Sequence, residues 1–405
     1  MAVAVVSPRS GSRVALRALP PLSLYVHLPW CVRKCPYCDF NSHELRGAMP
    51  EAAYVDAVVA DLDSALPSVW GRRVHSVFFG GGTPSLFSAA AIERLLSAFR
   101  ARLPLAADAE ITLEANPGTV EAEKFRDFRA AGVNRLSVGI QSFDPRRLAA
   151  LGRIHDDREA RHAVEVARAY FENFNLDLMY ALPEQTIAAA EADVAEAIAT
   201  GAPHLSFYHL TIEPNTVFHK HPPPLPDEDA AAAIHELVAA RLAGAGYAHY
   251  ETSAHARPGL ESRHNLNYWR FGDYLGIGAG AHSKVSFADR IVREMRTRSP
   301  AEYVRRVADG TQVAERREVD ARELPFEFMM NALRLTEGFE IGTFADRTGL
   351  PITVAGKALA AAEAKGLISR DHLRIRPTDL GRRFLNDLLQ LFLPEQSRRE
   401  KAERA

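Results

Sequence analysis

The chain alternates short β-rich apolar runs with longer segments of helical spacing, and this alternation is what most constrains its fold. The expected strands are residues 22–28, 74–79, 110–113, 135–140, 175–179 and 205–209. The helical segments between and after them are residues 52–66, 92–103, 122–131, 158–170 and 188–200. Strands that alternate with helices of this length form βαβ units with right-handed crossovers, and hence a parallel sheet.

The loops after these strands decide between an open sheet and a barrel. Glycine and polar residues follow nearly every expected strand at its carboxyl end. A β/α barrel gathers all these ends around one mouth, whereas an open doubly wound sheet concentrates its site at one switch point. The sequence therefore favours an α/β fold with a partial (β/α)6 barrel of the TIM type.

With 405 residues, the chain is expected to form two domains. We expect an N-terminal extension (1–21), the barrel with an aromatic-rich extension (22–285), a connecting segment (286–322), a second domain (323–393) and a charged tail (394–405). In the second domain, three helices (324–334, 341–348, 352–365), a hairpin (367–375) and a last helix (377–391) resemble a winged helix. That fold binds DNA or serves as a packing or partner module; acids partly offset its arginines, which favours the module.

Composition excludes some functions. The net charge of -2 gives no nucleic-acid footprint, and no apolar run reaches the roughly 18–20 residues of a membrane span. We therefore expect a cytoplasmic protein, with docking on a membrane surface left open. Residues 1–21 contain three arginines and no acid. They have the composition of a mitochondrial transit peptide, but alanine and arginine are frequent throughout, which favours a disordered bacterial extension.

The chain contains three cysteines, all between residues 31 and 38. An odd, clustered set excludes a disulfide framework and indicates a metal or cluster site in a reducing compartment. Thiolates of Cys31, Cys35 and Cys38 can hold three corners of an iron–sulfur cube and leave one iron open. The alternative is a zinc site with His43 as fourth ligand. A position at a barrel mouth, beside a glycine-rich loop, disfavours zinc.

The pattern C-x3-C-x-aromatic-C after the first strand resembles the radical S-adenosylmethionine superfamily, over roughly residues 22–284. The resemblance implies a [4Fe–4S] cluster on the three cysteines. It also implies that S-adenosylmethionine chelates the open iron and is cleaved to a 5′-deoxyadenosyl radical. Arg153 is expected to pair with its carboxylate and Tyr37 to contact its adenine. The other implied contacts are Tyr25, Gly81, Gly82, Thr83, Glu114, Gln141 and Asp177.

Two further motifs resemble the oxygen-independent coproporphyrinogen III oxidase group and, within it, the HemW family of haem chaperones. The run Cys38-Asp39-Phe40-Asn41 lacks the fourth cysteine of the oxidases, and residues 264–269 match the HNxxYW motif, followed by a glycine-rich run at 276–282. This implies that His264 contacts haem, with an imidazole for iron and aromatic area for the macrocycle. Without the resemblance, His264 is interpreted as a structural residue, a polar side chain with its hydrogen bonds satisfied among packed aromatic residues. His282 and His209 are weaker candidates.

Three functions follow as hypotheses. The first is a chaperone that binds haem, a cluster and S-adenosylmethionine and delivers haem to apo-proteins, respiratory ones above all. The second is a radical enzyme that decarboxylates propionates of coproporphyrinogen III. The third is a zinc-stabilised regulator that uses the winged-helix-like end. For the first we expect S-adenosylmethionine cleavage without coproporphyrinogen oxidase activity, a reductant as partner and no nucleic acid; a homodimer is left open.

Overall fold

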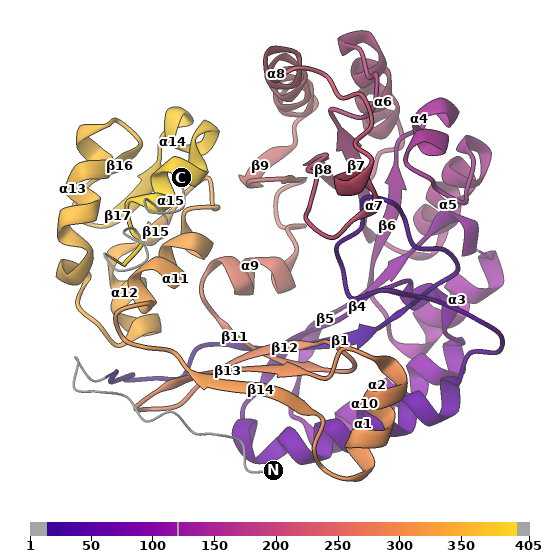
Figure 1. Ribbon diagram of the computed structural model, residues 1–405, viewed down its shortest axis with the longest axis horizontal. Coiled ribbons are helices and arrows are strands. Elements are labelled where there is room, and N and C mark those ends of the chain that lie inside the picture. The colour runs from indigo at the N-terminus through magenta and orange to yellow at the C-terminus, as the bar shows by residue number, and fades with distance from the viewer. Residues whose placement is uncertain (1–13, 120, 395–405) are drawn as a thin grey trace.

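The computed structural model describes residues 14–119 and 121–394 of the chain. Within these ranges a twelve-stranded sheet with helices along its outer face forms the larger part of the molecule (Figure 1). A smaller α+β module, formed by the end of the chain, lies beside it.

Six parallel strands form the central part of the large sheet. They are β1 (Leu22–Leu28), β4 (Val74–Gly81), β5 (Leu105–Ala115), β6 (Arg135–Gln141), β7 (Asn173–Tyr180) and β8 (His204–His209). They lie side by side in chain order, and every neighbouring pair is parallel. The six-stranded partial barrel predicted from the alternation is confirmed, as a mixed sheet that stays open.

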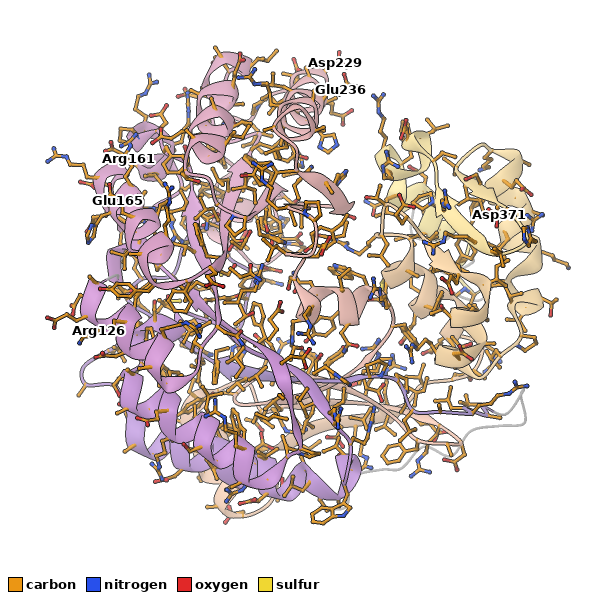
Figure 2. The ribbon with its side chains drawn as sticks, turned by 180° about the vertical axis from the view of Figure 1, so that it is seen from behind. Arg126, Arg161, Glu165, Asp229, Glu236 and Asp371 are labelled. Carbon is orange, nitrogen blue, oxygen red and sulfur yellow. The ribbon has the colours of Figure 1, made fainter. Side chains whose placement is uncertain are left out.

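Helices cover the outer face of these strands. They are α1 (Glu51–Val69), α2 (Ala89–Arg102), α3 (Ala122–Ala131), α4 (Pro145–Ala150), α5 (Asp157–Tyr170), α6 (Ile187–Ala199) and α8 (Glu228–Gly244). The short α7 (Val217–Lys220) instead packs on the loop after β1, where Phe218 N–H donates to Pro36 O at 3.0 Å. Local signals fix their starts: Asp156 and Glu159 form a capping box at α5. Apolar faces of the helices pack on outward strand residues in one core. Charged residues such as Arg161, Glu165 and Glu236 project from the opposite helix faces (Figure 2).

Further strands extend the sheet on both sides. On one side β11 (Asp273–Ile277) runs parallel to β1, followed by antiparallel β12 (His282–Ser286), β13 (Ile291–Arg296) and β14 (Val313–Glu318). On the other side lie β10 (Ala254–Ala256) and β9 (Ala248–Glu251). The expected connecting segment 286–322 thus contains β13, α10 (Pro300–Ala308) and β14. Sequence patterning missed β14 because it is a charged, exposed edge strand without apolar alternation.

The C-terminal module has its own core, which includes Phe328 and Phe344. Its helices are α11 (Leu324–Ala332), α12 (Ile341–Thr348), α13 (Gly356–Ala364), α14 (Asp379–Arg383) and α15 (Leu385–Gln390). Its sheet has the order β15 (Phe339–Glu340), β17 (Arg374–Pro377) and β16 (Ile368–Arg370). The predicted hairpin is present as β16 and β17. The last helix, expected to be continuous, is divided where Phe384 leaves helical backbone geometry.

The start of the described chain packs against this module. Val14 and Leu16 are buried in its core, and Leu16 N–H donates to Ala288 O at 2.9 Å. The prediction of a disordered extension over 1–21 is therefore wrong for residues 14–16, because two apolar side chains are buried there; residues 1–13 lie outside the described residues. So do residues 395–405 of the expected tail. None of the described helices combines the length and apolar character needed to cross a membrane.

Candidate functional site

The three cysteines lie on the loop after β1, at the carboxyl ends of the parallel strands. Cys31 belongs to β2 (Trp30–Cys31), which pairs with β3 (His43–Glu44) in a short parallel ribbon. Cys35 and Cys38 lie in the loop between these strands, where Cys38 N–H donates to Cys35 O at 3.1 Å. All three are free, partly exposed thiols. One loop therefore presents three potential thiolate ligands at one end of the sheet.

Polar groups approach the sulfur atoms. The guanidinium of Arg153 donates from Nη1 to Cys35 Sγ at 3.5 Å, and Cys38 Sγ lies 3.6 Å from Ser42 Oγ. Burial raises the pKa of the Cys31 thiol, and a hydrogen bond with the Thr83 side chain opposes this shift. The thiolate is the form that binds metals, and hydrogen-bond donors directed at sulfur favour it.

This donor set fits an iron–sulfur cluster better than a zinc ion. His43, the fourth ligand that a zinc site requires, hydrogen-bonds instead to Asn41 Oδ1 through Nε2 at 3.3 Å. Three thiols from a single loop are the ligands that a [4Fe–4S] cluster with one open iron requires.

The glycine-rich loop after β4 packs directly on the cysteine loop. Gly82 N–H donates to Leu28 O at 2.8 Å, and Thr83 N–H donates to Trp30 O at 2.7 Å. Gly81 has φ +114°, and a Cβ at this position would lie 2.5 Å from the His27 ring. A Cβ on Gly82 would lie 2.5 Å from Trp30 O. Glycine is required at both positions, because a Cβ would collide with the His27 ring at Gly81 and with the backbone of residues 29–30 at Gly82.

Two acids from β5 and β7, the strands on either side of β6, contribute to the same site. Glu114 on β5 accepts a hydrogen bond from Gly81 N–H at 3.2 Å, and Asp177 on β7 accepts from Ser137 Oγ at 2.7 Å. Burial raises the pKa of Glu114 to about 8, and repulsion by Asp177 adds to the shift. Burial also raises the pKa of Asp177. Acids whose pKa values are raised by burial are typical of functional sites.

The remaining expected contacts are Arg153, Gln141, Tyr37 and Tyr25. Arg153 Nη2 donates to Gly139 O at 2.8 Å, and its buried Nε has no partner among the described residues. A Cβ on Gly139 would lie 2.9 Å from Gln141 Nε2 and 3.4 Å from Arg153 Nη2, so these two side chains share one space. The Tyr37 ring packs on Phe218 at 6.2 Å, and Tyr25 stacks on Phe78 at 6.3 Å. The unpaired guanidinium nitrogen fits a carboxylate ligand.

His264 lies at the opposite end of the strands. It belongs to α9 (Arg263–Trp269), on the inner side of the sheet (Figure 1), and its Nδ1 is 2.9 Å from Ser76 Oγ. Ser76 precedes Gly81 by five residues on β4, which separates His264 from the glycine loop by about 16 Å along the strand. The ring is 1% exposed, lies 4.9 Å from Phe78, and has no partner for Nε2 within the described chain. Burial lowers its pKa to about 3.

Comparison with known proteins matches both parts of the chain. Residues 25–197 match the model of the radical SAM superfamily, and residues 319–384 match that of the HemN C-terminal domain. The heme chaperone HemW of Escherichia coli K12 is 52% identical over 93% of this chain and 99% of its own length. HemW of Haemophilus influenzae is 47% identical, again over 93% of this chain and 99% of its own length.

The chain belongs to the HemW family. The relationship extends to distant members, since HemW of Bacillus subtilis is 33% identical over 92% of this chain and 99% of its own length. Among solved structures, coproporphyrinogen III oxidase (HemN) from Escherichia coli, a radical SAM enzyme, superposes with a TM-score of 0.79. The superposition covers 92% of this chain and 90% of HemN at 24% identity. This likeness shows that the HemW-family chain has the HemN fold.

The structure also explains two HemW-like sequence runs whose roles the sequence left open. Asn41, just after the cysteines, donates from Nδ2 to Ala279 O at 3.0 Å and to Arg298 O at 2.9 Å. Gly280 has φ +80°, and a Cβ there would lie 2.2 Å from Asn41 Nδ2. The run after the third cysteine and the glycine-rich run at 276–282 thus fit against each other. Only the glycines hinted at such a close approach; nothing in the sequence pointed to Asn41 as its partner.

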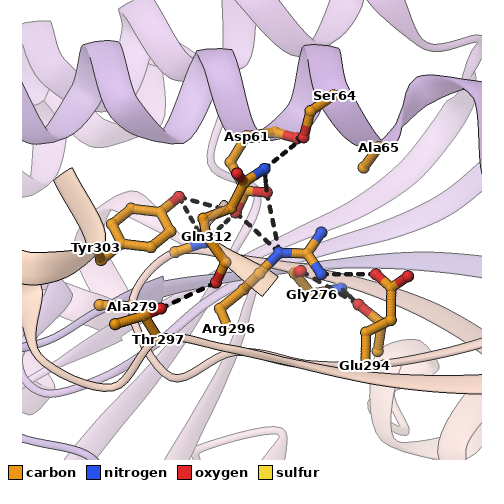
Figure 3. Close-up of polar contacts among 12 residues, drawn as sticks. Asp61, Ser64, Ala65, Gly276, Ala279, Glu294, Arg296, Thr297, Tyr303 and Gln312 are labelled. Atoms are coloured by element: carbon orange, nitrogen blue, oxygen red, sulfur yellow. Dashed lines mark hydrogen bonds and ion pairs between the residues drawn. The ribbon is translucent and has the colours of Figure 1, made fainter. Parts of the chain in front are cut away.

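A buried ionic network lies next to the contact between Asn41 and Gly280 and stabilises it. Asp61 on α1 accepts from Arg296 Nε at 2.9 Å and from Tyr303 Oη at 2.8 Å (Figure 3). It also accepts from Gly278 N–H at 3.2 Å. Glu294 accepts from Arg296 Nη1 at 2.7 Å. The carboxylate of Asp61 therefore fixes the backbone two residues before Gly280, where Asn41 docks. Sequence reasoning missed this network because its members come from α1, β13 and α10.

Proposed function

We propose that this chain is a haem chaperone that binds haem, holds a [4Fe–4S] cluster with S-adenosylmethionine, and delivers haem to apo-proteins. The observation that supports this proposal is that three free thiols on one loop lie beside a glycine loop, two half-buried acids and a half-buried arginine. Membership of the HemW family adds haem as the cargo, since its named relatives are heme chaperones. No single zinc ion accounts for this set of groups.

In this proposal Cys31, Cys35 and Cys38 supply the cluster ligands. When bound and reduced, the cluster supplies one electron to the sulfonium of S-adenosylmethionine. The chain's own residues bind and orient: Arg153, with its unpaired Nε, takes the carboxylate. Gly81 and Gly82 let backbone approach the ligand, Thr83 adds a hydroxyl, and the acids Glu114 and Asp177 take its amine or hydroxyl groups. Gln141, Tyr25 and Tyr37 complete the expected contacts.

Haem is assigned to α9, which carries the HNxxYW run. His264 Nε2 is a buried acceptor without a partner among the described residues, an atom that iron ligation would satisfy. Because the ring is 1% exposed, haem reaches it only if α9 moves away from β4. Exposed His282 and His209 remain the weaker candidates.

Anaerobic reconstitution followed by haem titration tests this function. Wild-type protein should give a saturable change in the haem absorption spectrum, and His264→Ala should weaken binding. His162→Ala, on the exposed face of α5, is the matched control, because its side chain is 57% exposed. Absence of any spectral change in the wild type contradicts the chaperone assignment.

The second candidate is coproporphyrinogen III oxidase activity, which the shared fold with HemN favours. Product analysis separates the two functions. Formation of 5′-deoxyadenosine without protoporphyrinogen supports the chaperone with a cleavage-competent cluster. Formation of protoporphyrinogen from coproporphyrinogen III, in the presence of S-adenosylmethionine, a reductant for the cluster and an electron acceptor for the substrate, supports the oxidase.

We further propose respiratory apo-proteins as acceptors, peripheral membrane association during delivery, and a homodimer. Haem transfer to an apo-acceptor in pull-down and vesicle-flotation experiments tests the first two. Light scattering after gel filtration tests the third; a mass of 44.6 kDa corresponds to a monomer.

A further inference from the structure

Buried polar side chains connect Asp177, at the cofactor end of the strands, with α9 at the other end. Asn175 Nδ2 donates to Asp177 Oδ1 at 2.8 Å, and Asn175 Oδ1 lies 2.6 Å from His204 Nδ1. His204 Nε2 lies 2.8 Å from Tyr250 Oη, which accepts from Ser262 N–H at 3.3 Å. Ser262 is the N-cap of α9. Each link is within hydrogen-bond distance, so the chain is continuous from the acid to the helix.

The directions of these bonds are determined by their chemistry. Ser137 Oγ donates to the second oxygen of Asp177 at 2.7 Å, so it accepts from Asn175 Nδ2 at 2.8 Å. The amide oxygen of Asn175 therefore faces His204, which must donate from Nδ1. A neutral histidine then has a bare Nε2, which accepts from the Tyr250 hydroxyl. Burial, with a contribution from Arg135, lowers the pKa of His204 well below its usual range, in agreement with the neutral ring.

The α9 end of the chain is held firmly. Glu110 accepts from the backbone N–H groups of Arg263 at 3.0 Å and His264 at 2.9 Å. The Ser262 side chain accepts from Asn265 N–H at 3.3 Å. His204 and Asn175 are 1% and 3% exposed, so water does not compete for the bond between them, and the two bonds of Tyr250 are partly buried. In such low-dielectric surroundings hydrogen bonds polarise one another, and a change at one end alters the strength of the next.

We propose that His204 and Tyr250 are positioning residues that couple ligand occupancy at Asp177 to the placement of α9. The inference rests on the proposed function, which assigns S-adenosylmethionine to Asp177 and haem to α9. A ligand hydroxyl that donates to Asp177 competes with Asn175 and Ser137 for its oxygens. The bond from Asn175 to Asp177 is then weakened, and this changes the bonds from Asn175 to His204 and from His204 to Tyr250. The bond from Tyr250 to the N-cap of α9 weakens in turn, which loosens the first turn of the helix. Coupling between two sites is reciprocal, so haem on α9 changes S-adenosylmethionine affinity by the same factor.

The decisive variant is Tyr250→Phe, which removes the hydroxyl that links His204 to Ser262 and keeps the ring. Tyr247→Phe is the matched control, because Tyr247 also loses one buried hydroxyl bond, to Ala202 O at 2.6 Å, outside the chain of bonds. Both variants use the full chain with an oxidised reconstituted cluster, so that S-adenosylmethionine binds without being cleaved.

Hydrogen exchange of the peptide 262–269 is the main measurement, and it needs no haem. Saturating S-adenosylmethionine should change the amide exchange rate of this peptide in the wild type and in Tyr247→Phe. In Tyr250→Phe the exchange rate of the peptide should be the same with and without S-adenosylmethionine. In the wild type, the dissociation constants for haem measured with and without S-adenosylmethionine should differ by about 5-fold or more. In Tyr250→Phe the two constants should be equal.

No exchange response in the wild type, or an equal response in Tyr250→Phe, overturns the coupling. Failure of haem binding overturns the proposed function alone, because the exchange response is measured before haem is added.

Discussion

Replacing Asp61 with asparagine should destabilise the fold strongly and loosen the cysteine loop. Asp61 is fully buried, and its two oxygens accept from Arg296, Tyr303, Gln312 and the Gly278 N–H group. All four are donors. An amide at this position therefore directs an NH2 group at a donor and leaves the buried guanidinium with Glu294 as its remaining carboxylate.

The magnitude follows from these contacts. Removing one partner of a buried ion pair costs about 3–5 kcal/mol. Because Glu294 still pairs with Arg296 at 2.7 Å, we expect a loss near 3 kcal/mol in the free energy of unfolding. This is a large fraction of the roughly 5–15 kcal/mol that stabilises a typical native protein.

Urea unfolding followed by tryptophan fluorescence measures the loss, and iron content after gel filtration measures cluster retention. Asp63→Asn is the control on the same helix, because Asp63 pairs with Arg102 while its side chain is 47% exposed. That exposed pair should contribute less than about 1 kcal/mol. A loss in Asp61→Asn no greater than in Asp63→Asn, with unchanged iron retention, would refute the role assigned to the buried network.

Three further predictions concern the site. In Gly280→Ala, the left-handed backbone alone should cost about 1–2 kcal/mol of unfolding free energy. The new Cβ also collides with the Asn41 amide, so the total cost should be larger and iron retention should fall. Gly342→Ala, where nothing lies within reach of the new Cβ, should be neutral. For Glu114, burial raises the pKa from 4.5 to about 8, so its stabilising contribution is complete below pH 4.5 and is lost as pH rises towards 8. Urea midpoints of wild type relative to Glu114→Gln should therefore fall across this range; parallel curves contradict the raised pKa. Cys38→Ala should abolish the iron–sulfur absorption of reconstituted protein with little change in the unfolding midpoint, and a retained spectrum would remove Cys38 from the ligand set.

The central architecture was predictable because its signals are local. Each strand of the parallel part is an apolar run bounded by turn residues, and several outer helices have a side-chain cap, as at Asp156 and Thr186. The thiol site was predictable for the same reason, since Cys31, Cys35 and Cys38 lie within eight residues. The glycines at 81 and 82 predicted a close approach to the backbone, and in the structure the His27 ring approaches Gly81 and the Trp30 backbone oxygen approaches Gly82.

The sequence alone determined that six parallel strands carry a three-thiol loop and polar groups at their carboxyl ends, because periodicity and motif spacing are properties of neighbouring residues. Only the tertiary structure decided where distant segments meet. It placed His264 on the inner side of the sheet, in contact with Phe78 and at the end of the strands away from the cysteines. It also brought Asn41 into contact with Gly280. It also linked Asp177 to α9 through His204 and Tyr250. These contacts join residues far apart in the chain, and their geometry depends on burial and strand register, which no local pattern encodes.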